Sequence, residues 1–166
     1  MATPTNLPAS FSTAQILTAA QMNDLRGAFR ILQVVGGSTS TIVANSTTTM
    51  ADTGLTATIT PQSTTSKILV IVSQTFGKNS GNANNAVVSI ILRGGTNIST
   101  FQGAALYTGT TVDLVGPSAS AVVLDSPATT SATTYKTQFA NFSASASVSA
   151  NTNSALATIT LLEVSA

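Results

Sequence analysis

The residues that could perform acid–base chemistry are five carboxylates, in a chain of 166 residues that has no histidine and no cysteine. They are Asp24, Asp52, Asp113, Asp125 and Glu163. Two carboxylates can flank a glycosidic bond, but one of these falls in an expected helix, two at turn positions and two at strand positions without an evident partner. Catalysis by histidine or cysteine and ordinary zinc sites are excluded. We therefore predict no enzyme activity, no catalytic residue, no cofactor and no metal.

Polar residues in the segment 77–85, GKNSGNANN, could bind a ligand without transforming it. Lys78, Asn82 and Asn84 could contact a sugar at a loop tip, although exposed hairpin tips in general use the same residue types. The glycines of the chain form neither a phosphate-binding loop nor a dinucleotide fingerprint. We take these three residues as contact candidates, with 96–110 as a second candidate loop.

The element that must support such loops is a strand. Ser66–Phe76, SKILVIVSQTF, contains five consecutive apolar residues, too few for a membrane span and too β-branched for a helix. Because a strand with one wet face alternates, this run and Ala86–Leu92 need cover on both faces. The core of the domain would cover one face, and a second layer or another subunit must cover the other. We expect another subunit, in a closed homotrimer. The subunit-interface candidates are Ile71, Val72, Val88 and Ile90.

Short strands at turn spacing, with no helix between them, predict a mainly β fold over 31–166. The pattern is typical of an antiparallel β-sandwich, jelly-roll-like in plan. Gly36-Gly37 is expected to stop the first strand, Ile31–Val35, and 96–119 to form loops with short strands. The other expected strands are 41–43, 48–50, 54–61, 67–76, 86–92, 120–124, 133–140, 142–149 and 155–164.

Residues 1–30 differ from the rest of the chain. The first 12 are expected to form an extended arm, and 18–26 a short helix with a capping box at Thr18 and Gln21. An apolar stripe follows this helix, and a helix so short needs a surface to rest on. That surface could be its own sandwich, sister helices or a carrier protein. The attachment candidates are Leu17, Met22, Leu25 and Phe29.

Composition restricts the partners. Hydrophobic residues make up 43% of the chain and charged residues 7%, with a net charge of +1, so a core is expected and disorder is not. The six basic residues are spread singly, which argues against nucleic-acid binding. We expect no secretory signal peptide and no membrane insertion, because the chain starts without a signal-like segment and has no apolar run of 18 residues.

Three segments resemble proteins of tailed phages. LPASFSTAQILTAAQMNDLR resembles the N-terminal segment of many tail-fibre and minor virion proteins. TTSKILVIVSQTF, and LDSPATTSATTYKTQFAN with the closing ATITLLEV, resemble strands of a β-sandwich module common in fibres of environmental phages. That module is similar to the trimeric jelly rolls of the tumour-necrosis-factor-like class.

The resemblance implies a structural protein of the virion, assembled in the host cytoplasm. The leading hypothesis is a short trimeric tail fibre that docks on other virion proteins through residues 1–30. Its loops, with Lys78, Asn82 and Asn84, would contact the host, and host surface polysaccharide is a candidate partner. The alternatives are a capsid decoration or cement protein and a free lectin-like module, while a polysaccharide-degrading spike is disfavoured by the scattered acids. The chain has no shaft, which leaves its position on the particle open.

Overall fold

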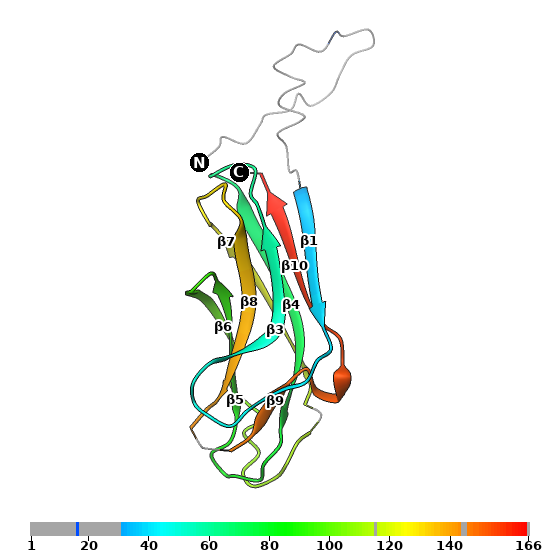
Figure 1. Cartoon of the computed structure of the whole chain (residues 1–166), viewed down its shortest axis with the longest axis vertical. Coiled ribbons are helices and arrows are strands. Elements are labelled where there is room, and N and C mark those ends of the chain that lie inside the picture. Colours follow the sequence, from blue (N-terminus) through cyan, green and yellow to red (C-terminus); the bar gives the residue numbers. More distant parts are fainter. Residues whose placement is uncertain (1–15, 17–30, 115, 144–145, 166) are drawn as a thin grey trace.

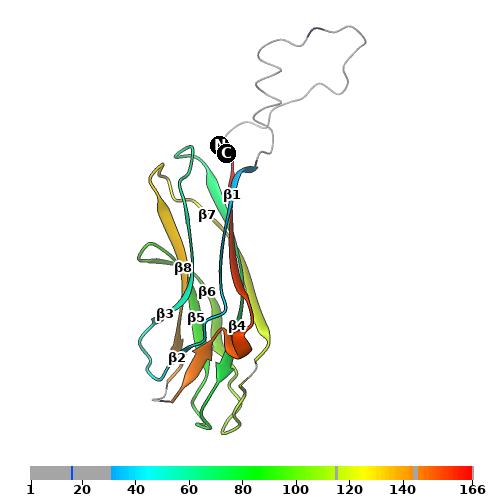
Figure 2. The same cartoon turned by 45° about the vertical axis from the view of Figure 1, so that its right-hand side comes forward.

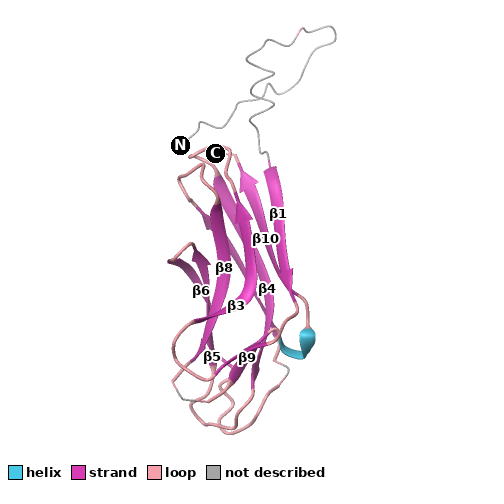
Figure 3. Cartoon of the chain, in the orientation of Figure 1, coloured by secondary structure: helices cyan, strands magenta, loops and turns pink. Residues whose placement is uncertain are grey.

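The computed structural model of the chain describes residues 16, 31–114, 116–143 and 146–165. Within these residues the protein is mainly β, with ten strands, antiparallel pairing throughout and one short 3₁₀ turn (Figure 3). The helix expected over 18–26 and the attachment candidates Leu17, Met22, Leu25 and Phe29 lie outside the described residues. No helix in the described part is long and apolar enough to cross a membrane.

One sheet contains the longest strand of the chain at its centre. Its strands are β1 (Ile31–Thr39), β2 (Val43–Asn45), β4 (Lys67–Lys78), β7 (Ser118–Asp125), β9 (Val148–Ala150) and β10 (Ala157–Val164). β10 and then β9 pair along one edge of β4, β7 pairs along its other edge, and β1 and β2 pair with β10 and β9. The sheet is therefore four strands wide, in the order β1/β2, β10/β9, β4, β7.

The second sheet has the order β3-β8-β5-β6. Its strands are β3 (Ala51–Ile59), β8 (Thr133–Asn141), β5 (Val87–Arg93) and β6 (Thr96–Ala105). The two sheets face each other as separate layers (Figure 2). The expectation of a mainly β, antiparallel sandwich is confirmed.

Alternation along each strand fills the space between the layers. In β4, the side chains of Ile68, Val70, Val72 and Phe76 are buried. Residues of both sheets join them in two clusters, since every second side chain of a strand points to the same side of its sheet. The larger cluster is built around Ile68, Val70, Val72, Leu55, Ile59, Ile91, Tyr135, Ile159 and Leu161, and the smaller around Phe76, Val87, Phe139 and Val148.

A buried polar network also joins the two sheets. Gln74 of β4 accepts a hydrogen bond from the Thr137 hydroxyl (3.0 Å) and donates to the Asn151 side chain (2.7 Å). Asn151 in turn donates to the carbonyls of Thr41 and Thr53 at 2.7 and 2.9 Å. Asn151 has φ 59°, a left-handed conformation that asparagine tolerates, and it interrupts the strand between β9 and β10 before the 3₁₀ turn η1 (Thr152–Ser154).

Four sequence expectations about strands were wrong, the first being the strand expected over 48–50, where the structure has a bend and no strand. Gly36 and Gly37 lie inside β1, where a Cβ on Gly37 would come 2.0 Å from the Thr56 carbonyl oxygen, so glycine there permits close approach of the sheets. Residues 96–105 form one full strand, with register shifts that hid its alternation. In contrast, the described residues of the strand expected over 142–149 form a strand only from Val148, where β9 begins, and Phe142 is exposed.

The sandwich has two ends with different roles in the chain path. β1 begins and β10 ends at one end, which we call the terminal end (Figure 1). The β4–β5, β6–β7 and β8–β9 connections gather at the opposite end, which we call the loop end. The long β4 therefore runs from the terminal end to the loop end.

Candidate functional site

The outward side of the first sheet presents apolar side chains to solvent. Val34 is 59% exposed, Val122 66%, Leu124 61% and Ile71 38%, and these values are high for large apolar residues on ordered strands. Strand pairing sets them side by side with partly buried leucines. We call the whole set the apolar face, which consists of Val34, Leu69, Ile71, Val122, Leu124 and Leu162.

The register shows that this surface is continuous. Val34, Leu162, Leu69 and Leu124 are consecutive partners across β1, β10, β4 and β7. One pair further along β4, Ile71 lies beside Val122, with Thr160 and Gly36 completing that row. Because laterally paired residues lie on the same side of a sheet, the six apolar residues form one patch near the terminal end.

The rest of the same surface has hydroxyl groups and almost no charge. The next row towards the loop end consists of Ser38, Thr158, Ser73 and Ser120. Of the charged residues in β1, β4, β7 and β10, which the structure describes in full, Lys67 alone has an outward strand position. It lies at the terminal edge and donates to the Ser126 hydroxyl at 2.7 Å.

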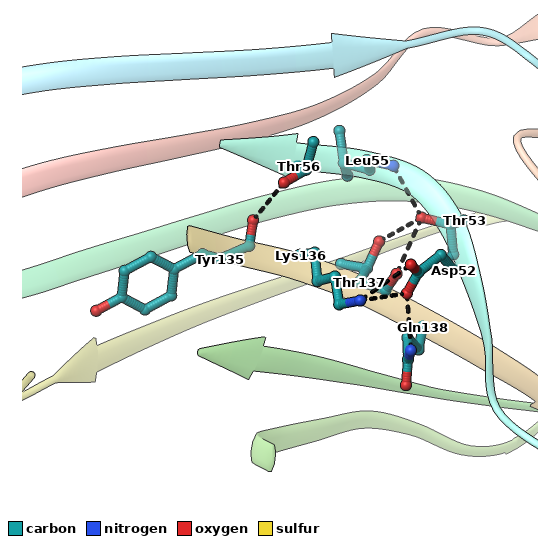
Figure 4. Close-up of polar contacts among 8 residues, drawn as sticks. All are labelled: Asp52, Thr53, Leu55, Thr56, Tyr135, Lys136, Thr137 and Gln138. Atoms are coloured by element: carbon teal, nitrogen blue, oxygen red, sulfur yellow. Dashed lines mark hydrogen bonds and ion pairs between the residues drawn. The ribbon is translucent and has the colours of Figure 1, made fainter. Parts of the chain in front are cut away.

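On the second sheet, the outward side of β3 and β8 is polar instead. Lys136 Nζ lies 2.8 Å from Asp52 Oδ1, and Gln138 Nε2 donates to the same oxygen at 2.7 Å. Figure 4 shows these three side chains together on one side of β3 and β8. The hydrogen bond from Lys136 holds the pKa of Asp52 below its ordinary value. A shallow cavity of about 150 Å³ lies beside them, where the pairing of β3 and β8 is irregular.

The four subunit-interface candidates therefore occupy three different environments. Ile71 is part of the apolar face, whereas Val72 is fully buried in the core, because neighbours in a strand point to opposite sides. Val88 and Ile90 point outward from the second sheet, and Ile90 is 8% exposed, so its own subunit already covers it. The expectation that another subunit covers them is therefore wrong for Val72 and Ile90, whereas Ile71 is exposed and Val88 is partly exposed.

The three contact candidates, Lys78, Asn82 and Asn84, also lie in different environments. Lys78 is fully buried at the end of β4, where its ammonium donates to the Gly109 carbonyl, so it does not project from a loop tip. Asn82 and Asn84 are exposed. Asn82 Oδ1 accepts from the Asn84 backbone N–H at 2.9 Å and so shapes the loop that presents Asn84.

Asn84 connects three segments of the loop end. Its Oδ1 accepts a hydrogen bond from the Tyr107 hydroxyl at 3.2 Å, and its carbonyl accepts one from the Ser143 hydroxyl at 2.9 Å. Tyr107 and Phe142 meet edge to face, with ring centroids 6.3 Å apart and an interplanar angle of 81°. The two loops expected to carry contacts therefore touch each other, and a third segment joins them.

Sequence reasoning missed Phe142 and the exposed β7 residues Val122 and Leu124. Phe142 was assigned to a strand because it alternates with serines. The signal available for β7 was the run AVVLD, which has the same unbroken apolar character as the central strand. No sequence signal pairs Asn84, Tyr107 and Phe142, because their contact depends on the meeting of three separate connections.

Of the four carboxylates that the structure describes, Asp125 and Glu163 both pair with Ile68, from opposite edges of β4. Asp125 binds Arg93 across the two sheets at 2.8 Å and accepts from the Tyr135 hydroxyl at 2.7 Å. Burial, followed by this hydrogen bond, raises the pKa of Tyr135 well above its ordinary value. Within the described residues no three potential metal ligands of the carboxylate, histidine or cysteine type come together.

Glu163 is fully buried at the terminal end beneath the apolar face. It accepts from Gln33 Nε2 at 2.6 Å and from the Gln62 backbone N–H at 2.7 Å. Burial acts to raise the pKa of Glu163, but these hydrogen bonds outweigh burial and hold the pKa below its usual value. A carboxylate held in this way connects β10 to β1 and to the β3–β4 loop.

No protein-family model matches this sequence, and a search of curated proteins found no match either.

Proposed function

We propose that the protein is a structural component of a phage virion, a short trimeric tail fibre whose loop end contacts the host. The sequence resemblance of its N-terminal segment and of three strands to phage fibre proteins supports this function. The strand order supports the jelly-roll description, since eight strand positions divide into two four-stranded layers. The proposed tail-fibre function does not depend on the sandwich being a jelly roll.

The apolar face is the observation that carries the proposal. A contiguous patch of large apolar side chains on a soluble surface commonly marks an interface between proteins. It lies on an otherwise regular sheet and lacks the charges that would keep copies apart. Three copies arranged about an axis would cover this patch on every subunit and leave no open end for further growth.

The placement of the two ends fits attachment and contact at opposite poles. Residues 1–30 join the sandwich at the start of β1, at the terminal end, where the apolar face also lies. Leu17, Met22, Leu25 and Phe29 are proposed to dock on other virion proteins. Docking of three such segments together would strengthen attachment by avidity. Once the first segment of a trimer has bound, binding of the second and third becomes intramolecular.

Deletion of residues 1–30 tests this function. The truncated chain should remain a folded trimer and should be missing from purified particles. Incorporation at the normal copy number would show that the segment is not the attachment device. Failure to fold would assign the apolar stripe of 17–29 to the sandwich core.

Copy number separates the tail fibre from the capsid decoration protein. Quantitative mass spectrometry of purified particles should give tens of copies for a tail fibre, against hundreds for a cement protein. A particle reconstruction would place the terminal end on the tail or on the capsid directly. Absence of the chain from particles would contradict both forms of the proposal and favour a free binding module.

A further inference from the structure

The loop end carries the exposed aromatic rings of the described chain. Tyr107 is 55% exposed and Phe142 is 49% exposed, whereas Phe76, Phe139 and Tyr135 are buried. The two exposed rings touch each other in the edge-to-face geometry that aromatic pairs prefer. The Tyr107 and Phe142 rings are exposed to solvent at the same place, far from the apolar face. Folding of the chain alone does not explain their exposure.

The backbone before Tyr107 is held in an unusual conformation. Leu106 has φ 62°, in the left-handed region that bulky residues seldom occupy. In this conformation the Leu106 side chain packs inward on the smaller core cluster while the Tyr107 ring stays exposed. The Thr108 backbone N–H donates to the Leu106 carbonyl at 2.9 Å and fixes the turn. Strain of this kind tends to be kept where it serves a function.

Polar groups lie at the border of the rings. Asn84 Oδ1 is occupied by the Tyr107 hydroxyl at 3.2 Å, which fixes the orientation of the amide. In the part of the chain that the structure describes, the Nδ2 group of Asn84 has no hydrogen-bond partner and is available as a donor. Lys78, the nearest ammonium along this loop, is fully buried, and Asp113, in the connection that follows Tyr107, is partly exposed, so among the described residues no exposed cation borders the rings.

We propose that Tyr107, Phe142 and Asn84 bind a neutral saccharide ring. The C–H face of a pyranose packs on an aromatic ring, and its equatorial hydroxyls pair with amide donors and acceptors, so a ring pair bordered by an amide fits both requirements. Because no exposed cation borders the rings in the described part of the chain, a neutral sugar is favoured over a uronic or sialic acid. A macromolecular protein partner would need a larger apolar core than two rings provide.

This inference deepens the proposed function by naming the ligand class of the loop end, and it rests on that function only for the origin of the saccharide. The test is saturation-transfer NMR on the full chain. The probes are neutral oligosaccharides of glucose, galactose, mannose and N-acetylhexosamines, with a uronic-acid oligosaccharide as the charged comparison. At least one neutral probe should receive saturation and the charged one should not.

Variants then locate the site. Tyr107→Ala and Phe142→Ala should each weaken binding about tenfold or more, which corresponds to about 1.4 kcal/mol. Tyr107→Phe, which keeps the ring but frees Asn84, should cost less. Leu156→Ala removes an apolar side chain that is 66% exposed outside this site, and it should leave binding unchanged. Unchanged thermal midpoints would show that each variant is folded.

Binding by none of the neutral probes would overturn the inference, and so would binding by Tyr107→Ala and Phe142→Ala equal to that of the unaltered chain. So would a rise in molecular mass with concentration that both variants abolish, because a second copy would then occupy the rings. The two proposals can fail separately. Saccharide binding by a chain absent from particles removes the virion function alone, and a chain present in particles without saccharide binding removes this inference alone.

Discussion

The outward surface of β3 and β8 in the second sheet differs in chemistry from the apolar face of the first sheet. On the second sheet Lys136, Asp52 and Gln138 form a charged, hydrogen-bonded surface suited to water (Figure 4). On the first sheet the corresponding positions near the terminal end hold leucine, isoleucine and valine. Both sheets contribute to the core through their inward faces. The difference between the outward faces supports the proposal that the apolar face binds a partner.

The strongest test of this comparison uses two neighbours in β4. Val72→Asp would bury an unpaired carboxylate in the core and should cost on the order of 3–5 kcal/mol, enough to unfold a marginally stable domain. Ile71→Asp places the same group on the apolar face and should leave each subunit folded while blocking association. Circular dichroism melts of the two variants would measure the difference. Equal loss of structure in both would break the distinction between core and face.

A prediction of intermediate size concerns Glu163, beneath the apolar face. Its pKa is lowered in the folded protein, so its contribution to stability is present above the ordinary glutamate value of 4.5 and is lost as pH falls through the lower folded value. Glu163→Gln should therefore flatten the decline in thermal midpoint as pH falls from about 5 towards 3. If the thermal midpoint of this variant fell with pH as it does in the unaltered protein, groups other than Glu163 would cause the decline.

The smallest effect is expected on the polar face. Lys136→Ala removes an ion pair in which the Asp52 side chain is 55% exposed, and such pairs contribute roughly 0.2–1 kcal/mol. Denaturant unfolding should show a change in that range, with no change in molecular mass. A loss of association would place a subunit contact on this face and contradict the division between the two sheets.

Much of the fold could be predicted because the pattern of apolar and polar residues along each strand indicates which of its faces is buried. The unbroken run Ile68–Val72 correctly indicated one face in the core and a second face lacking cover. It could not show which residue belongs to which face, because an apolar run without polar breaks hides the alternation. Hence Val72 was grouped with Ile71, although the former is fully buried and the latter 38% exposed.

Other features depend on tertiary contacts and leave no local signal. Gly37 appeared to be a strand terminator, because its close approach to Thr56 of the other sheet cannot be seen in one segment. Lys78 appeared to be exposed because lysine usually is, yet its ammonium reaches the Gly109 carbonyl inside the loop end. The meeting of Asn84 with Tyr107 and Phe142 is likewise a product of topology.

The most direct test of the account is the mass of the full chain in solution, measured by sedimentation with a matched pair of variants. Val122→Asp changes the apolar face at a residue that is 66% exposed, and Thr58→Asp changes an exposed position on the outward side of the second sheet. We predict three times the chain mass of 16.7 kDa for the unaltered protein and for Thr58→Asp, and a folded monomer for Val122→Asp. A stable monomer of the unaltered chain at micromolar concentration, or a trimer that survives Val122→Asp, would contradict it.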